Sequence, residues 1–198
     1  MKAKILIFGI VILVIPVIYG ISVNNGLVDK EERVNSAWAQ VENQYQRRSD
    51  LIPNLVNTVK GAANFEQQTL DDVISARSRA TSIQVNASDL NSSQKLQQFQ
   101  EAQSQLSGAL SRLLVTVERY PELKGISAFN DLQRQLEGTE NRIATERKRF
   151  NDAAQNYNSS IRKFPGSIFA GMFGFDPKAY FEADQGAETA PTVDFGSN

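Results

Sequence analysis

The sequence predicts an all-α protein, with an N-terminal transmembrane helix followed by an up-and-down antiparallel bundle of three to four long helices. Three observations support this prediction: an uncharged apolar run near the N-terminus, a heptad spacing of large apolar residues through most of the chain, and no strand-like alternation. Of the 198 residues, about 170 lie beyond the apolar run, which is enough for one domain with a hydrophobic core.

Residues 1–28 are interpreted as a membrane anchor with a short cytoplasmic N-terminus and a linker at residues 24–26. Lys2 and Lys4 precede an apolar run over residues 5–23. A helix of this length spans about 28 Å, close to the roughly 30 Å of a bilayer's hydrocarbon core. The anchor residues are Ile5, Leu6, Phe8, Val11, Leu13, Val17, Tyr19 and Ile21.

A cleaved signal peptide is the alternative interpretation of the same run. Signal peptides have apolar cores of about 7–15 residues and a small-x-small cleavage site, and residues 17–22 offer no such site. The lysines lie before the run and a slightly acidic stretch, residues 29–33, lies after it. The positive-inside rule then predicts a single-pass protein of the cell (inner) membrane whose soluble domain is extracytoplasmic or periplasmic.

Residues 29–165 are expected to form the bundle. Apolar residues keep one heptad phase from Val34 to Ile83, with Arg48 and Glu66 as charged exceptions. Pro53 lies within this phase, and it either kinks one long helix or divides it into two. The continuous phase favours the kink, because a loop would have no reason to preserve the register.

Two further helices are expected in the bundle. A turn is predicted at residues 86–89, followed by a helical register from Leu96 to Tyr120 that Pro121 ends. The last register runs from Phe129 to Phe164 and ends at the following Pro-Gly pair. Short connections make neighbouring helices antiparallel.

Composition excludes several classes of function. The net charge of -1 gives no basic face for nucleic acid, and the chain has no cysteine and no histidine. Thiol nucleophiles, Ser-His-Asp triads and imidazole or thiolate metal sites are therefore excluded. We expect no enzyme, no cofactor and no metal site.

Arg48 occupies a core position in the heptad register. A buried guanidinium group requires a carboxylate partner, because an unpaired buried charge is very costly. Glu140 and Glu146 on the last helix are the candidate partners, and a structural ion pair that fixes the register of the helices is expected. A ligand or partner site is the alternative interpretation.

Residues 166–182 are aromatic and rich in glycine, and they follow the bundle. They are expected to pack either on the bundle itself or on another subunit, a partner or the bilayer. The residues predicted to contact a partner or the membrane are Ile168, Phe169, Met172, Phe173, Phe175, Tyr180 and Phe181. Residues 183–198 are interpreted as a flexible acidic tail.

Three stretches of the sequence resemble motifs of the LemA family of bacterial membrane proteins. Residues 38–56, WAQVENQYQRRSDLIPNLV, are similar to its long signature, and residues 140–143, 149–151 and 157–158 resemble its second motif. Residues 164–165 and 173–175 resemble the third. The resemblance implies a single N-terminal anchor and a soluble helical bundle, without a settled reaction. It also implies possible membrane protein partners, such as a metalloprotease or a TPM-domain protein.

Together these observations favour a non-enzymatic scaffold or interaction protein. It would be anchored in the bilayer by its N-terminal helix, form homo-oligomers at the membrane surface, and organise membrane-associated partners. The alternative is a lipid-binding or membrane-remodelling protein that acts directly on the bilayer. The identity of the partners and the number of subunits do not follow from the sequence.

Overall fold

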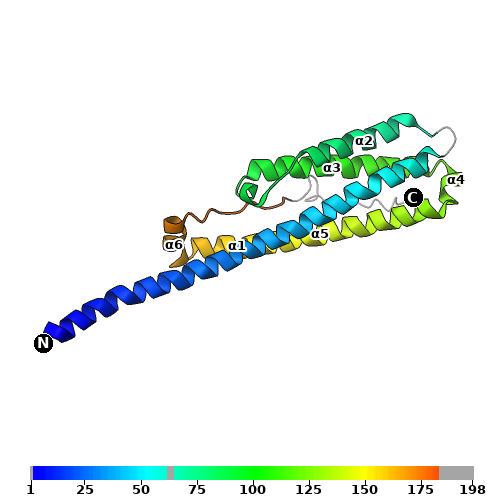
Figure 1. Cartoon of the computed structure of the whole chain (residues 1–198). Helices are drawn as coiled ribbons and strands as arrows, with labels where there is room; N and C mark the ends of the chain where they lie inside the picture. The colour runs from blue at the N-terminus through cyan, green and yellow to red at the C-terminus, as the bar shows by residue number, and fades with distance from the viewer. Residues whose placement is uncertain (1, 62–64, 183–198) are drawn as a thin grey trace, which may run out of the picture.

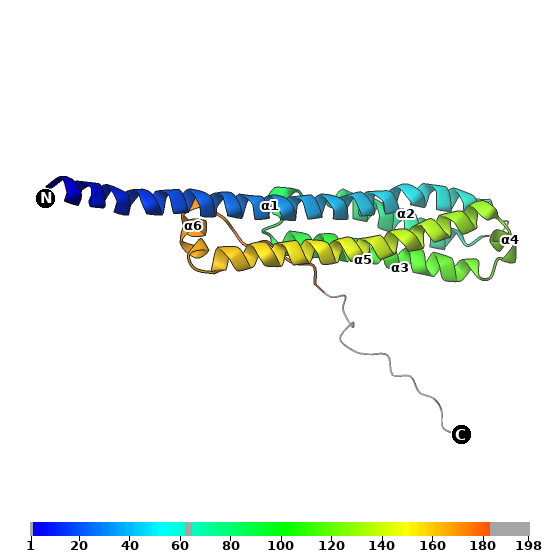
Figure 2. The same ribbon diagram turned by 90° about the horizontal axis from the view of Figure 1, so that it is seen from below.

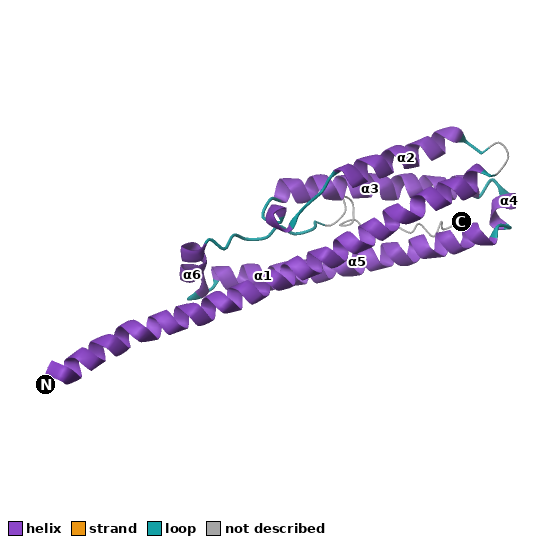
Figure 3. Ribbon diagram, in the orientation of Figure 1, coloured by secondary structure: helices purple, strands orange, loops and turns teal. Residues whose placement is uncertain are grey.

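The computed structural model describes residues 2–61 and 65–182, and for residues 2–13, 15, 16 and 124 it describes the backbone alone. The described residues form helices joined by short loops, without strands, so the all-α prediction is confirmed (Figure 3). The elements in chain order are α1 (Lys2–Lys60), α2 (Gln67–Ser82), a short 3-10 turn (Ala87–Asp89), α3 (Ser93–Val117), α4 (Pro121–Lys124), α5 (Ser127–Arg162) and α6 (Gly166–Phe173).

The four long helices α1, α2, α3 and α5 run alternately up and down (Figure 1). Helix α5 lies antiparallel along α1, and α2 and α3 form a second antiparallel pair beside them. Helix α1 extends beyond the other helices at its N-terminal end, and α6 lies against α1 at the place where α1 leaves the bundle (Figure 2).

The heptad phase of α1 packs into the bundle as predicted. Its core-facing members are all buried: Val34, Trp38, Val41, Tyr45, Arg48, Ile52, Leu55 and Val59. The core consists of two apolar clusters, one around Trp38 and Phe150 and the other around Ile52 and Leu113. Arg48 lies on α1 between the last residue of the first cluster and the first residue of the second.

Pro53 does not break α1, which continues to Lys60. A proline has no N–H, so the carbonyl group four residues earlier loses its helical hydrogen bond. That carbonyl belongs to Ser49, and Arg77 Nε of α2 donates to it at 2.9 Å. The neighbouring helix therefore satisfies the acceptor that the proline leaves free.

Two expectations about α1 are wrong. Residues 24–26 do not form a linker, because α1 is continuous through them. Leu27 is buried in the core next to them, and this packing outweighs the low helix propensity of asparagine and glycine. The long register is also not one helix, because the chain reverses between Lys60 and Gln67.

The reversal was hidden because both helices have the same apolar period. After it, α2 buries Leu70, Val73, Ala76 and Ala80, while Glu66 is exposed. Three of these four residues continue the phase of α1, and Leu70 replaces the expected Thr69. A heptad pattern describes each seam and contains no signal for the direction of the chain.

Candidate functional site

A buried polar layer around Arg48 joins the four long helices. The side chain of Arg48 is 1% exposed, and its Nη1 donates to Glu140 Oε1 of α5 and to Ser107 Oγ of α3, both at 2.7 Å. Its Nη2 donates to Gln103 Oε1 at 2.5 Å, and Gln103 Nε2 donates to the carbonyl of Ala80 on α2 at 3.2 Å. The layer thus connects α1, α3, α5 and α2.

Of the two candidate carboxylates, the structure brings only Glu140 to Arg48. Glu146 is paired with Arg149, one turn along the same helix, at 2.8 Å. Both terminal nitrogens of the Arg48 guanidinium group have protein acceptors, whereas Nε is buried without one, and the group lies 5.1 Å from the centre of the Tyr45 ring. This arrangement fits a structural role in joining the helices, because its contacts are made to the protein's own side chains.

An extended segment, residues 175–182, lies back along the bundle, and we call it the C-terminal strap. Its Phe181 is 5% exposed and stacks on Trp38 with ring centres 5.9 Å apart, while Phe150 meets it edge-on at 5.5 Å. Phe181 therefore belongs to the core, and its prediction as a contact with a partner or membrane is wrong. The strap thus adds the ring of Phe181 to the aromatic cluster that Trp38 and Phe150 form in the bundle.

Three amide side chains hold the backbone of the strap. Asn158 and Asn151 of α5 each donate to a strap carbonyl and accept from the N–H of the same residue, Lys178 and Phe181 respectively, at 2.8–2.9 Å. Gln100 of α3 makes the equivalent pair with Glu182. Each amide side chain supplies one donor and one acceptor, as a neighbouring strand would. The backbone N–H and C=O groups of these strap residues are therefore hydrogen-bonded although the strap is not part of a sheet.

A second set of contacts holds the middle of the strap. Lys178 Nζ lies 2.7 Å from Glu31 Oε1 of α1, and the Lys178 side chain is 5% exposed. The Tyr157 hydroxyl donates to the carbonyl of Asp176 at 3.0 Å. Burial, and then the negative charges of Glu31 and Asp176, raise the pKa of the Tyr157 hydroxyl well above its usual value. Tyr157 is therefore held in its neutral, donating form.

Only weak signals in the sequence point to these strap contacts. Asn151 and Asn158 stand in the stretch that resembles the second family motif, but nothing in their spacing assigns them a backbone partner. Phe175 is half-buried against Tyr157, and the hydroxyl of Tyr180 accepts a hydrogen bond from Asn158 at 2.8 Å. The strap therefore uses Phe175, Tyr180 and Phe181 to pack on the bundle of the same chain.

The remaining predicted contact residues lie together on α6. Ile168, Met172 and Phe173 are 53%, 70% and 52% exposed, and Phe169 is half-buried. The helix ends at Phe173 and is capped by Gly174, whose N–H donates to the carbonyl of Ala170. The φ of Gly174, 76°, is a left-handed conformation that glycine adopts readily. Helix α6 thus presents one apolar face to the surroundings while Ala170 packs inward.

Phe169 fixes α6 to α1. A Cβ atom placed on Gly20 would lie 2.8 Å from Phe169 Cε1, so the ring rests directly on the glycine. The ring of Tyr19 lies 6.3 Å from that of Phe169. The neighbouring residues Val17, Ile18 and Ile21 of α1 are all more than half exposed, at 61%, 62% and 57%. We call this surface of α1 and α6 the apolar end.

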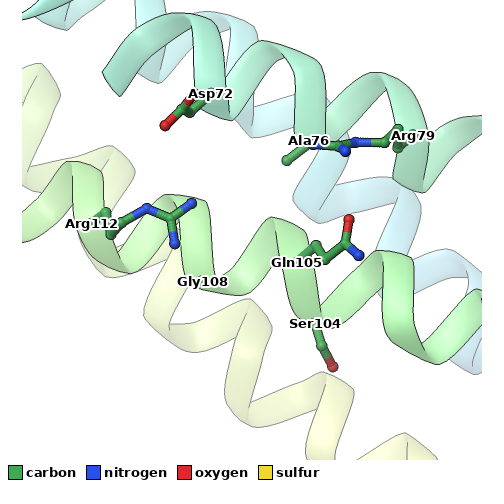
Figure 4. A pocket seen from close by; sticks show the side chains of 7 residues that line it. All are labelled: Asp72, Ala76, Arg79, Ser104, Gln105, Gly108 and Arg112. Atoms are coloured by element: carbon green, nitrogen blue, oxygen red, sulfur yellow. The ribbon is translucent and has the colours of Figure 1, made fainter. Parts of the chain in front are cut away.

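The hollows on the bundle are open, and their walls mix polar and apolar surface. The first is a groove of about 630 Å³ between α2 and α3. Figure 4 shows Asp72 and Arg79 of α2 on one side, with Gln105 and Arg112 of α3 on the other. Within the described ranges, no group of three or more acidic side chains is placed to hold a metal ion.

The predicted anchor lies mostly outside the described side chains. Among the residues described, no helix is both long and apolar enough to cross a membrane. Ile5, Leu6, Phe8, Val11 and Leu13 lie outside the described side chains, whereas Val17, Tyr19 and Ile21 are described and exposed. The acidic tail, residues 183–198, also lies outside the described residues.

Comparison with known proteins places the chain in a family. Magnetosome protein MamQ 2 of Paramagnetospirillum magneticum is 36% identical over 81 residues, which are 41% of this chain and 30% of that protein. Magnetosome protein MamQ of Magnetospirillum gryphiswaldense is 35% identical over the same shares of the two chains. The match thus spans less than a third of these magnetosome proteins.

A longer match is found with Protein LemA of Metamycoplasma hominis, which is 23% identical over 176 residues, or 88% of this chain and 76% of that protein. The family model described as the LemA family matches residues 37–195. This range contains most of the bundle, α6 and the strap. The chain therefore belongs to the LemA family.

Proposed function

We propose that this chain is a membrane-anchored, non-enzymatic scaffold that presents its helical bundle at a fixed orientation outside the cytoplasm. The observation that supports the proposal most directly is the continuity of α1 from Lys2 to Lys60. A helix of this length extends about 88 Å. The apolar residues at its start and the core residues Trp38 and Arg48 are parts of one rigid element, so the bundle would follow every tilt of the anchor.

A scaffold suits the chemistry of the bundle better than catalysis does. The buried charges Arg48 and Lys178 are paired with Glu140 and Glu31 of the same chain. These groups hold the helices and the strap in register, so they are already occupied. The described hollows are open grooves whose walls mix polar and apolar surface, which differ from the deep, mostly apolar pockets of small-molecule sites.

We further propose that the protein self-associates or binds other membrane proteins. Anchoring in one plane removes much of the orientational freedom that association otherwise costs, so modest surfaces on the bundle suffice. The metalloprotease or TPM-domain partners implied by family resemblance are candidates of this kind.

The test is crosslinking of the full chain in intact bacterial membranes, followed by mass spectrometry. Alkaline carbonate extraction of the same membranes shows whether the chain is integral. We expect resistance to extraction and recurrent crosslinks from the bundle to itself or to a membrane protein. A chain that is extracted contradicts the anchor, and an integral chain without specific crosslinks contradicts the scaffold.

The orientation has a separate test, because the chain contains no cysteine. Ser111 is exposed on α3, so Ser111→Cys introduces one reactive group on the bundle. A membrane-impermeant maleimide should label this variant in intact spheroplasts. Labelling only after lysis would place the bundle in the cytoplasm and contradict the proposed orientation.

A further inference from the structure

We propose that α6 lies in the bilayer interface and forms a second contact of the protein with lipid. The contacting side chains are Ile168, Met172 and Phe173, and they enter the boundary between headgroups and acyl chains. This inference rests on the proposed anchor, because α6 reaches lipid only where α1 enters the membrane.

The position of α6 along α1 is the first argument. Phe169 rests on Gly20, and Gly20 lies near the end of the apolar run over residues 5–23. If that run crosses the hydrocarbon core, the contact with α6 falls at the level where α1 emerges from it. Figure 2 shows α6 beside α1 at this place, with α1 continuing past it toward the N-terminus.

The chemistry of the exposed face of α6 is the second argument. Ile168, Met172 and Phe173 project from it, each more than half exposed. They continue the exposed apolar surface of Val17, Ile18 and Ile21 on α1. An interfacial helix needs such a face, because its binding grows with the apolar area that it buries among the lipids.

The residues around the apolar end complete the match to an interface. Arg162 and Lys163 are exposed at the start of the turn into α6, and Phe164 is 81% exposed beside them. Basic side chains next to an apolar face suit lipid phosphates, while an aromatic ring suits the headgroup level. A soluble partner would instead have to cover a surface that is continuous with the proposed membrane span.

The consequence is that the bundle keeps one rotational orientation about the axis of α1. A single transmembrane helix leaves the attached domain free to turn about the helix axis. A second contact on one side, held by Phe169 against Gly20, prevents that rotation and directs the same faces of the bundle to neighbouring molecules. The scaffold would then present its surfaces in one orientation.

The test uses Met172→Cys in the full chain, with an environment-sensitive fluorophore on the single cysteine. The protein is reconstituted in phosphatidylcholine vesicles that contain a minor fraction of phosphatidylglycerol and of lipid with a nitroxide near the headgroup. Ser111→Cys is the matched control, because Ser111 is exposed in the C-terminal half of α3, which leads to α4, and α4 lies at the end of the bundle opposite to α6. We expect quenching at position 172 to exceed quenching at position 111 several-fold.

Each outcome has one meaning when the same vesicles are washed at alkaline pH. Protein that resists the wash but shows equal quenching at both positions overturns the α6 contact and leaves the anchor intact. Protein that is removed by the wash overturns the proposed function. A fluorophore at position 172 that is shielded from water but unquenched by lipid, together with a disulfide between two copies of the unlabelled Met172→Cys chain after oxidation in the same vesicles, shows a second copy on this face and also overturns the inference. Ile168→Cys provides an independent second position.

Discussion

At the scale of single residues, the bundle depends on buried polar groups whose hydrogen-bond partners lie on other helices. Arg48 is almost fully buried, yet both terminal nitrogens of its guanidinium group, Nη1 and Nη2, have acceptors on α3 or α5. Pro53 leaves the carbonyl of Ser49, the residue next to Arg48, without a helical donor, and Arg77 of α2 supplies one. These contacts align α1 with its neighbours, because they form only in one register.

The two partners of the central ion pair should contribute unequally to stability. Glu140→Ala leaves the buried guanidinium group without its carboxylate and should lower the free energy of unfolding by about 3 kcal/mol. Arg48→Met should cost less, about 1–2 kcal/mol, because the released Glu140 is 42% exposed and can be hydrated. Chemical denaturation of both variants measures the difference. Equal stability of Arg48→Met and the natural chain would contradict a structural role for the pair.

Arg77 should matter only while Pro53 is present. Arg77→Met leaves the carbonyl of Ser49 without a donor and should lower the free energy of unfolding by about 1–2 kcal/mol. In a Pro53→Ala background the alanine N–H can satisfy that carbonyl, so the same change should cost clearly less. A double-mutant cycle measured by denaturation gives the coupling. Equal costs in both backgrounds would show that Arg77 acts in another way.

At the scale of elements, two segments after α5 have different tasks. The strap returns to the bundle and completes its aromatic cluster with Phe181. Helix α6 leaves an apolar face exposed and docks on α1 through Phe169. One stretch of similar aromatic composition is thus divided between the core and the surface.

The amide clamps should control the docking of the strap. Asn158→Ala removes both hydrogen bonds to the backbone of Lys178 and should lower the free energy of unfolding by roughly 1–3 kcal/mol. It should also increase hydrogen exchange at the Lys178 amide. Asn156→Ala is the matched control, because Asn156 is exposed on the same helix. Unchanged exchange in the Asn158 variant would contradict the clamp.

The close contact between Gly20 and Phe169 should hold α6 in place. A Gly20→Val side chain would collide with the ring and should increase hydrogen exchange throughout residues 166–173. Gly26→Val is the control, since a Cβ atom there meets no atom within 4 Å. Both changes alter the same helix with the same residue type. Equal exchange of α6 in the two variants would show that the contact does not position it.

At the scale of the whole molecule, the continuous α1 makes the anchor and the bundle one body. Insertion of a short Gly-Ser segment between Asn25 and Gly26, combined with Gly20→Val to release α6 from α1, should uncouple them, because Gly-Ser chains behave as flexible coils. The bundle should still fold and remain attached to membranes. Energy transfer from a fluorophore at Ser111→Cys to a membrane-bound acceptor should become broadly distributed. A distribution as narrow as that of the uninterrupted chain would contradict rigid coupling.

The sequence by itself determined the helical class and most of the buried face of α1, α3 and α5. The apolar period of α1, α3 and α5 is a local property, and residues such as Trp38, Phe99 and Phe150 are buried where that period predicts. The pairing of Arg48 with a carboxylate of the last helix also follows from the cost of a buried charge. The choice of Glu140 over Glu146 required the relative register of two helices.

Only the tertiary structure decided where the chain reverses and where its C-terminal segment docks. The turn before α2 left the apolar phase almost unchanged, so periodicity could not reveal it. The assignment of Phe181 to the core and of Met172 to the surface depends on the amide side chains of α3 and α5, which bind a backbone remote in sequence. Such contacts exist only after the helices have packed, because packing alone brings these amides to the strap.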